Sequence, residues 1–202
     1  MQLSTTLFAT LTYPFSTQIE AQGKLIQSMA DNHDLMAALE ASTNAVIEAL
    51  SHDRKIWLCG NGGSAADAQH LAAEFTGRFY FHRKALNAEA LHCNTSYLTA
   101  VANDYGYDEV YARMIEGLAK EGDVLIAFST SGNSANIIKA IETALKLKLC
   151  VIGFTGHTGG KMKGVCSHLI NIPSEDTPRI QEGHMLLGHL LCEQVEKALF
   201  PR

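Results

Sequence analysis

His70 and Glu74 lie four residues apart in the stretch AADAQHLAAEF, whose apolar spacing predicts a helix. Residues at positions i and i+4 project from one helix face, so this imidazole and this carboxylate would point toward one site. Such a pair can act as a general acid and base or bind a metal ion. The spacing is not that of a metalloprotease, because the second histidine of the H-E-x-x-H motif is missing.

A second group of polar side chains lies near the C-terminus, in the stretch RIQEGHMLLGH. Gln181 and His189 are eight residues apart, about two helical turns, and His184 lies between them. Two histidines, a glutamate and an amide oxygen could together form a four-ligand site for a metal such as zinc. A lone histidine on a packed helix is usually a core residue, so spacing alone leaves the role of His189 open. No role is assigned to His52, His82, His92, His157 and His168.

Two turns rich in glycine and hydroxyl groups offer a place for an anion. CGNGGS ends at Ser64 and STSGNS covers residues 129–134, and each joins a predicted strand to a predicted helix. Free backbone N–H groups and the helix dipole favour an anion there. Neither turn carries a charge, which suits a sugar monophosphate better than a nucleoside triphosphate with magnesium. Either turn could instead be an ordinary capped helix start, although the second has more hydroxyls than capping requires.

The elements that would position these residues alternate between strands and helices. Short apolar runs predict strands at residues 55–59, 88–93, 123–128, 149–154 and 169–172. Helical spacing predicts two N-terminal helices within 17–51, then helices at 65–76 (with Ser64 as N-cap), 94–102, 107–120, 135–147 and 178–199. This alternation predicts an α/β fold, a three-layer α-β-α sandwich around a mainly parallel five-stranded sheet. Residues 1–52 would form a helical arm of the same domain as residues 53–202.

The composition excludes several classes of protein. Of 202 residues, 47% are hydrophobic and 18% charged, the net charge is −5, and no basic stripe suggests a nucleic-acid partner. No apolar run is long enough to span a membrane, and MQLSTTLFATLTYPF lacks the pattern of a signal peptide. The five cysteines are odd in number and include no Cys-x-x-Cys, which favours a reduced, cytoplasmic location and disfavours a zinc-thiolate site.

From about Lys55 to the C-terminus, ordered motifs resemble the sugar isomerase (SIS) domain family and, within it, the phosphoheptose isomerases. The motifs are CGNGGS, DAQHLAAEFTGRF, AVANDYGYDEVYAR, GDVLIAFSTSGNSANIIKAI, TGHTGGKM and RIQEGHMLLGH. The first 50 residues fit the helical arm of that family only in character. The resemblance implies that residues 53–202 form a sugar-phosphate-binding SIS domain. It also implies a cytosolic homotetramer with active sites between subunits.

The same resemblance implies the site residues. One zinc ion per subunit would be bound by positions matching His70, Glu74, Gln181 and His189, and the acid/base pair would be Glu74 and His189. Metal ligation lowers the basicity of a carboxylate, so the two roles of Glu74 are in tension. Phosphate-binding positions match Ser64, Ser129, Thr130, Ser131 and Ser134. Sugar-contacting positions match Asn61, Asp104 and Gln181. We also expect substrate contacts from Gly62, Gly63, Glu74 and Asn103.

The implied reaction interconverts sedoheptulose 7-phosphate and D-glycero-D-manno-heptose 7-phosphate through an enediol, which supplies heptose for lipopolysaccharide and other surface polysaccharides. The alternative is a DiaA-type protein, a non-enzymatic SIS relative that binds the bacterial replication initiator DnaA. The stretches SAADAQH, ALNAEAL, HMLLGHLLC and ALFPR look similar to that relative, and Pro178 stands where the isomerase pattern has an aspartate. The relative lacks residues matching Glu74 and His189. Because both are present here, the sequence favours the enzyme.

Overall fold

A computed structural model of the chain describes residues 14–202. Residues 1–13 lie outside the described residues. They include most of the stretch for which no signal peptide is expected and the start of the expected arm. The centre of the fold is a five-stranded, entirely parallel sheet with the strand order β2-β1-β3-β4-β5. The strands are β1 (Ile56–Cys59), β2 (Ala88–Ala90), β3 (Val124–Ser129), β4 (Cys150–Thr155) and β5 (His168–Asn171).

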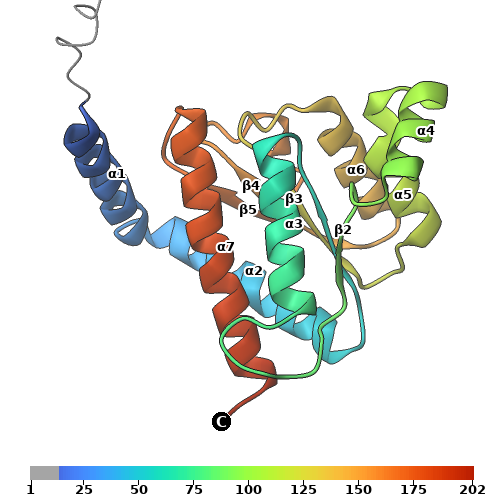
Figure 1. Cartoon of the computed structure of the whole chain (residues 1–202), viewed down its shortest axis with the longest axis horizontal. Coiled ribbons are helices and arrows are strands. Elements are labelled where there is room, and N and C mark those ends of the chain that lie inside the picture. Colours follow the sequence, from blue (N-terminus) through green and yellow to red (C-terminus); the bar gives the residue numbers. More distant parts are fainter. Residues whose placement is uncertain (1–13) are drawn as a thin grey trace, which may run out of the picture.

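Helices cover both faces of this sheet, which confirms the predicted three-layer α/β fold (Figure 1). The α-helices are α1 (Phe15–Ala30), α2 (His33–Ser51), α3 (Gly63–Thr76), α4 (Thr95–Tyr105), α5 (Val110–Leu118), α6 (Ala135–Lys146) and α7 (Thr177–Leu199). Two short 3-10 helices are η1 (Tyr107–Glu109) and η2 (Gly160–Met162). On one face lie α2, α3 and α7, and on the other lie α4, α5 and α6. Within residues 14–202, no helix is both long and apolar enough to span a bilayer.

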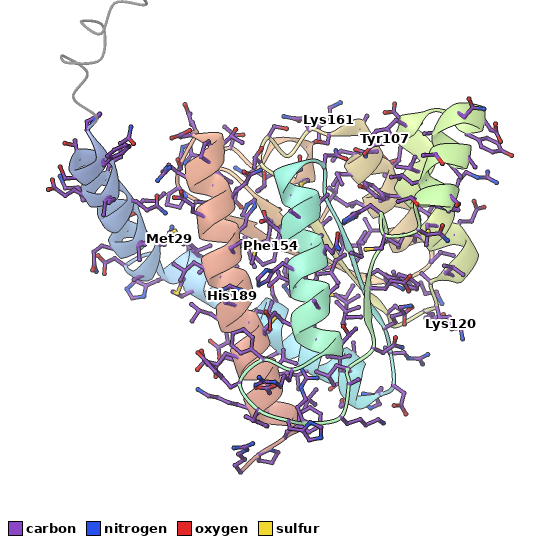
Figure 2. The ribbon with its side chains drawn as sticks, viewed as in Figure 1. Met29, Tyr107, Lys120, Phe154, Lys161 and His189 are labelled. Atoms are coloured by element: carbon purple, nitrogen blue, oxygen red, sulfur yellow. The ribbon has the colours of Figure 1, made fainter. Side chains whose placement is uncertain are left out.

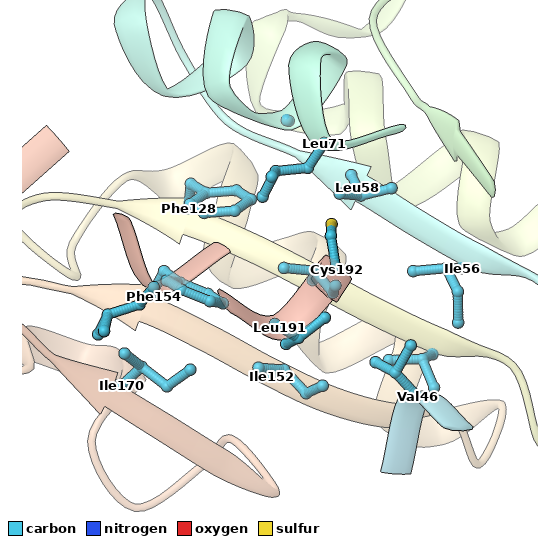
Figure 3. Packing of buried hydrophobic residues seen from close by; sticks show 14 of the residues in the cluster. Val46, Ile56, Leu58, Leu71, Phe128, Ile152, Phe154, Ile170, Leu191 and Cys192 are labelled. Atoms are coloured by element: carbon cyan, nitrogen blue, oxygen red, sulfur yellow. The ribbon is translucent and has the colours of Figure 1, made fainter. Parts of the chain in front are cut away.

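Each central strand contributes to two separate hydrophobic cores. In β1, Ile56 and Leu58 pack under α2, α3 and α7, whereas Trp57 and Cys59 pack under α5 and α6. Successive side chains of a strand point to opposite faces, so a strand covered on both faces must be apolar at every position. Figure 3 shows the first core, in which Leu58 lies among residues of the strands and helices that surround it, including Leu71 of α3.

Helix α1 projects away from the body of the fold (Figure 1). Its last turn is anchored by Met29, which is buried, but Ile19 and Ile26 farther along the same helix are exposed. By contrast, α2 packs directly on the core with residues such as Val46. The helical segment before β1 therefore consists of one projecting helix and one helix that belongs to the sandwich.

Several element ends differ from the sequence-based expectations. Helix α3 begins at Gly63 with Gly62 as its N-cap, not with Ser64, because the cap residue has φ 55° and ψ −120°, which favours glycine. Ser64 instead lies buried in the first turn. The predicted helix at 107–120 begins as a 3-10 turn, and the predicted strand at 88–93 ends at Ala90.

His184 of α7 is a core residue and does not join the polar group predicted from the sequence. It is fully buried next to Phe128 and Phe154, and its Nε2 donates a hydrogen bond to the carbonyl oxygen of Thr155 at 3.2 Å. Within the described residues, its Nδ1 has no partner. Burial lowers the pKa of His184 to about 4, an effect that the hydrogen bond to Thr155 partly opposes. The ring is therefore neutral at pH 7.

This burial predicts a loss of stability in acid. The unfolded chain binds a proton at His184 below pH about 6.5, whereas the folded protein does so only near pH 4. The contribution of His184 to the free energy of unfolding is thus complete above pH 6.5 and falls as the pH drops toward 4. At pH 5 it is lower by about 2 kcal/mol. Urea unfolding at pH 7 and pH 5 measures this for the wild type and for His184→Asn. Equal pH dependence in both proteins would contradict the assignment, and the exposed His52→Asn is the matched control.

Candidate active site

His70 and Glu74 of α3 meet His189 of α7 at the surface of the helical layer. The Nε2 atoms of His70 and His189 are 2.9 Å apart, and His70 Nε2 lies 3.2 Å from Glu74 Oε1. The two rings have centroids 5.0 Å apart. The His70 and Glu74 side chains are 49% and 24% exposed, so the cluster is open to solvent in the single chain. Figure 1 shows α3 and α7 side by side, and Figure 2 marks His189 on α7.

The cluster forms because α3 and α7 approach closely at one point. A Cβ added to Gly188 would lie 2.6 Å from Leu71 Cδ1, which is too close for any side chain larger than glycine without a shift of Leu71. Leu71 follows His70 directly in sequence, and Gly188 directly precedes His189. The buried neighbours of the two histidines therefore set the distance between the helices, and the histidines meet beside that contact.

The donor set fits a zinc-type ion. One nitrogen from each of His70 and His189 and one oxygen from Glu74 all lie within 4.8 Å of one another. Two histidines and a glutamate are a known ligand set of catalytic zinc, which leaves a fourth position for water or substrate. At 2.9 Å the facing Nε2 atoms can either share one proton or both direct lone pairs toward a cation.

Gln181, the fourth expected ligand, lies elsewhere on α7. It precedes His189 by eight residues, about 12 Å along a helix axis. Its amide packs against the first turn of α3, where a Cβ on Gly63 would lie 2.5 Å from Gln181 Nε2. The structure thus brings three of the four predicted ligands together and places Gln181 against the glycine turn instead.

The glycine turn after β1 is tied to the start of α6 by a pair of amides. Asn61 Nδ2 donates to Asn136 Oδ1 at 2.9 Å, and Asn136 Nδ2 donates to Asn61 Oδ1 at 2.8 Å. The hydroxyl of Tyr107 also donates to Asn61 Oδ1, at 3.4 Å. The polar atoms of Asn61 are therefore engaged within the protein. Sequence reasoning missed Asn136, whose only signal was its place just after the serine-rich turn.

The hydroxyls of the serine-rich turn are not used as helix caps. Ser134 is the N-cap residue of α6, yet its side chain makes no capping hydrogen bond, and its Oγ lies 3.0 Å from Ser129 Oγ. Gly132, with φ 67°, packs on the backbone of Gly159, whose carbonyl oxygen would lie 2.2 Å from an added Cβ. Ordinary capping therefore does not account for this turn.

A pocket of about 290 Å³ opens beside the serine-rich turn, at the carboxyl ends of β3, β4 and β5. Thr130, Ser131, His157 and Glu175 are among the residues that line it. Neither His157 nor Glu175 was among the predicted site residues. Their only signal was that each follows a strand at the sheet edge where ligands of parallel α/β folds bind.

Asp67 is another residue near the cluster that sequence reasoning missed. It lies one turn before His70 on α3, and its Oδ2 is buried with no hydrogen-bond partner among the described residues. Burial raises the pKa of Asp67 to about 6, and the nearby charge of His70 partly opposes that increase. Carboxyl groups whose pKa is raised by burial occur often at functional sites.

Asn103 and Asp104 lie away from the cluster, at the exposed C-terminal end of α4. Asn103 Nδ2 donates to Asp104 Oδ1 at 2.8 Å. In Figure 1, α4 lies on the opposite side of the fold from α7. A single chain therefore does not bring these two predicted sugar contacts to His189.

Comparison with known proteins identifies the family of the chain. Residues 20–156 match the SIS domain. The phosphoheptose isomerase of Burkholderia pseudomallei is 47% identical over 190 residues, which cover 94% of this chain and 96% of the relative. That of Helicobacter pylori is 52% identical over 163 residues, which cover 81% and 85%.

Solved structures give the same result. The phosphoheptose isomerase GmhA from Neisseria gonorrhoeae superposes with a TM-score of 0.85 at 40% identity, covering 91% of this chain and 97% of its own. The NanR protein of Vibrio vulnificus, at 17% identity and a TM-score of 0.65, shares the fold alone. These relatives give no support to the initiator-binding alternative. The chain therefore belongs to the SIS domain family and, within it, to the phosphoheptose isomerases.

Proposed function

We propose that this chain interconverts sedoheptulose 7-phosphate and D-glycero-D-manno-heptose 7-phosphate. The observation that carries the proposal is the meeting of His70, Glu74 and His189, two imidazoles and a carboxylate contributed by two helices. Aldose–ketose isomerisation moves a proton between C1 and C2 through an enediol, which requires a base at carbon and a second group that moves protons at oxygen. A protein that only binds a partner has no need for this constellation, so the cluster disfavours initiator binding.

In this proposal Glu74 is the base that takes the proton from carbon, and His189 transfers protons between the two sugar oxygens. One zinc ion per subunit, held by His70, Glu74 and His189, would polarise the sugar carbonyl. Glu74 has two carboxylate oxygens, of which one can face the ion while the other faces the substrate carbon. Gln181 contacts the sugar beside the glycine turn, about two turns of α7 from His189.

The phosphate end of the substrate is assigned to the two turns. The hydroxyls of Ser129, Thr130, Ser131 and Ser134, with Ser64 and the backbone of Gly62 and Gly63, supply neutral donors there. The N-termini of α3 and α6 add their helix dipoles. A seven-carbon sugar phosphate would lie between these turns and the cluster, with its reacting carbons next to Glu74.

The positions of Asn103 and Asp104 favour an active site shared between subunits. Because α4 lies far from the cluster in one chain, their contacts with sugar require a neighbouring copy. This supports the proposal of a homotetramer, and the exposed Ile19 and Ile26 of α1 offer apolar surface for such an association. We assign the enzyme to the cytoplasm, where it would supply heptose for lipopolysaccharide or other surface polysaccharide.

The proposal predicts zinc-dependent turnover. Purified protein incubated with sedoheptulose 7-phosphate and zinc should yield the aldose, detected by chromatography or NMR. Removal of the metal with a chelator should lower the rate at least about 10-fold, because the carbonyl is no longer polarised, and added zinc should restore it. Turnover that resists complete metal removal would refute the zinc assignment but not the isomerase. No turnover together with tight binding of the replication initiator would establish the alternative.

A second prediction concerns the base. Glu74→Gln should lower kcat by about 10²–10⁴-fold, since an amide cannot accept the proton from carbon. Affinity for the sugar phosphate, measured by calorimetry on this inactive variant, should change only a few-fold, because the phosphate contacts lie elsewhere. The matched control is Glu121→Gln, which breaks an exposed ion pair with Lys148 and should leave turnover unchanged. Full activity in Glu74→Gln would remove Glu74 from the mechanism.

A further inference from the structure

An ion pair between Arg83 and Glu196 lies buried behind the catalytic cluster. Arg83 belongs to the loop that joins α3 to β2, and Glu196 lies near the end of α7. Arg83 Nε is 3.1 Å from Glu196 Oε1, and both side chains are 2% exposed. Neither residue was singled out by the sequence, and neither takes part in the chemistry proposed above. A buried ion pair is rarely more stable than well-packed apolar residues, so its presence calls for another explanation.

Arg83 binds the end of the helix that carries Glu74. Its Nη2 donates to the carbonyl oxygen of Glu74 at 2.7 Å, and its Nη1 donates to the carbonyl oxygens of Phe75 at 2.6 Å and Gly77 at 3.1 Å. The last carbonyls of a helix have no partner within the helix, and the dipole favours a cation there. The guanidinium therefore fixes the last turn of α3 from Glu74 onward.

Glu196 binds the next part of the same loop. Its Oε1 accepts a hydrogen bond from the backbone N–H of Phe79 at 3.0 Å, and its Oε2 accepts one from Tyr80 at 2.7 Å. Burial alone would raise the pKa of Glu196, but these two hydrogen bonds and Arg83 hold it below its usual range. The carboxylate is therefore charged at neutral pH, with three donors around it.

The ion pair is also connected to His189 in two ways, through α7 and through Phe79. Glu196 follows His189 by seven residues, about two turns, so both lie on nearly the same side of α7. The ring of Phe79, whose N–H is held by Glu196, lies against the ring of His189 with centroids 5.8 Å apart. The end of α3, the loop after it and α7 are thus joined at one point behind the three clustered side chains.

We propose that Arg83 and Glu196 are positioning residues that hold Glu74 and His189 at the separation the reaction requires. The inference rests on the proposed function, since it concerns the geometry of the same cluster. Apolar side chains could fill the same volume but could not direct hydrogen bonds to both the Glu74 carbonyl and the Phe79 N–H. Loss of the pair would let α3 and α7 shift relative to each other near the cluster without removing any catalytic group.

The test compares Glu196→Gln with the wild type. A glutamine has one acceptor oxygen, so its NH₂ group would face an N–H donor of Tyr80, Phe79 or Arg83. Partners that orient metal ligands typically change affinity or activity by about 10–100-fold when they are removed. We expect kcat to fall by at least about 10-fold with KM within about two-fold. We expect the dissociation constant for Co²⁺, measured by competition with a chelator, to rise by at least about 10-fold.

The control for a purely structural effect is Ile115→Ala, which opens a cavity in the core on the opposite face of the sheet. Ile115→Ala should lower Tm by about as much as Glu196→Gln does. Its kcat and its Co²⁺ affinity should stay near those of the wild type. The inference is wrong if Glu196→Gln keeps kcat and the Co²⁺ dissociation constant within two-fold of the wild type. It is also wrong if Ile115→Ala changes these two quantities as much as Glu196→Gln does. Arg83→Lys keeps the charge but not the fork of donors. It is expected to show the same losses to a smaller degree, and it decides the question if Glu196→Gln does not fold.

The Co²⁺ measurement separates this inference from the proposed function. It requires no turnover, so it reports on the geometry of His70, Glu74 and His189 even if the chain acts on a different sugar phosphate. A wild type that binds Co²⁺ tightly but converts no sedoheptulose 7-phosphate would count against the proposed substrate alone. Weakened Co²⁺ binding in Glu196→Gln would still support the positioning role.

Discussion

The close contact between Leu71 of α3 and Gly188 of α7 is the constraint on which the site depends. Two helices that carried larger residues at this point would lie farther apart, and their outward-facing neighbours would no longer meet. Because His70 and His189 each stand next to one member of this contact, the packing of the core determines the distance between the two imidazoles. A glycine with no chemistry of its own is thus as important to the geometry of the cluster as the residues to which we assign the reaction.

The parallel sheet explains where the other half of the site lies. In the strand order β2-β1-β3-β4-β5, the chain continues from β1 to β2 on one side and from β3 to β4 on the other. Ligands of such folds bind at the carboxyl ends of the strands beside this reversal. The glycine turn follows β1 and the serine-rich turn follows β3, and the pairing of Asn61 with Asn136 joins them. In the proposed function, these joined turns would receive the phosphate, while the reacting carbons would face the helical layer.

Much of this could be predicted from residue spacing, because alternating strands and helices produce strong and distinct patterns. The five strands, the seven α-helices and the pairing of His70 with Glu74 were all predicted, although several ends moved by a few residues. Spacing could not reveal that His184 is buried while His189 is at the surface, since α7 packs against both α2 and α3. Nor could it reveal Arg83 and Glu196, which are more than a hundred residues apart and become partners only in the folded chain.

The reciprocal amides of Asn61 and Asn136 have a consequence for how the enzyme responds to acidity. Neither amide titrates, and the hydroxyls around them stay neutral, so the frame to which we assign the phosphate keeps the same donors from acid to base. A phosphate group near its second ionisation, at about pH 6, meets the same frame in either charge state. The hydrogen bonds between Asn61 and Asn136 therefore hold the two turns together in the same way on both sides of the phosphate's second ionisation.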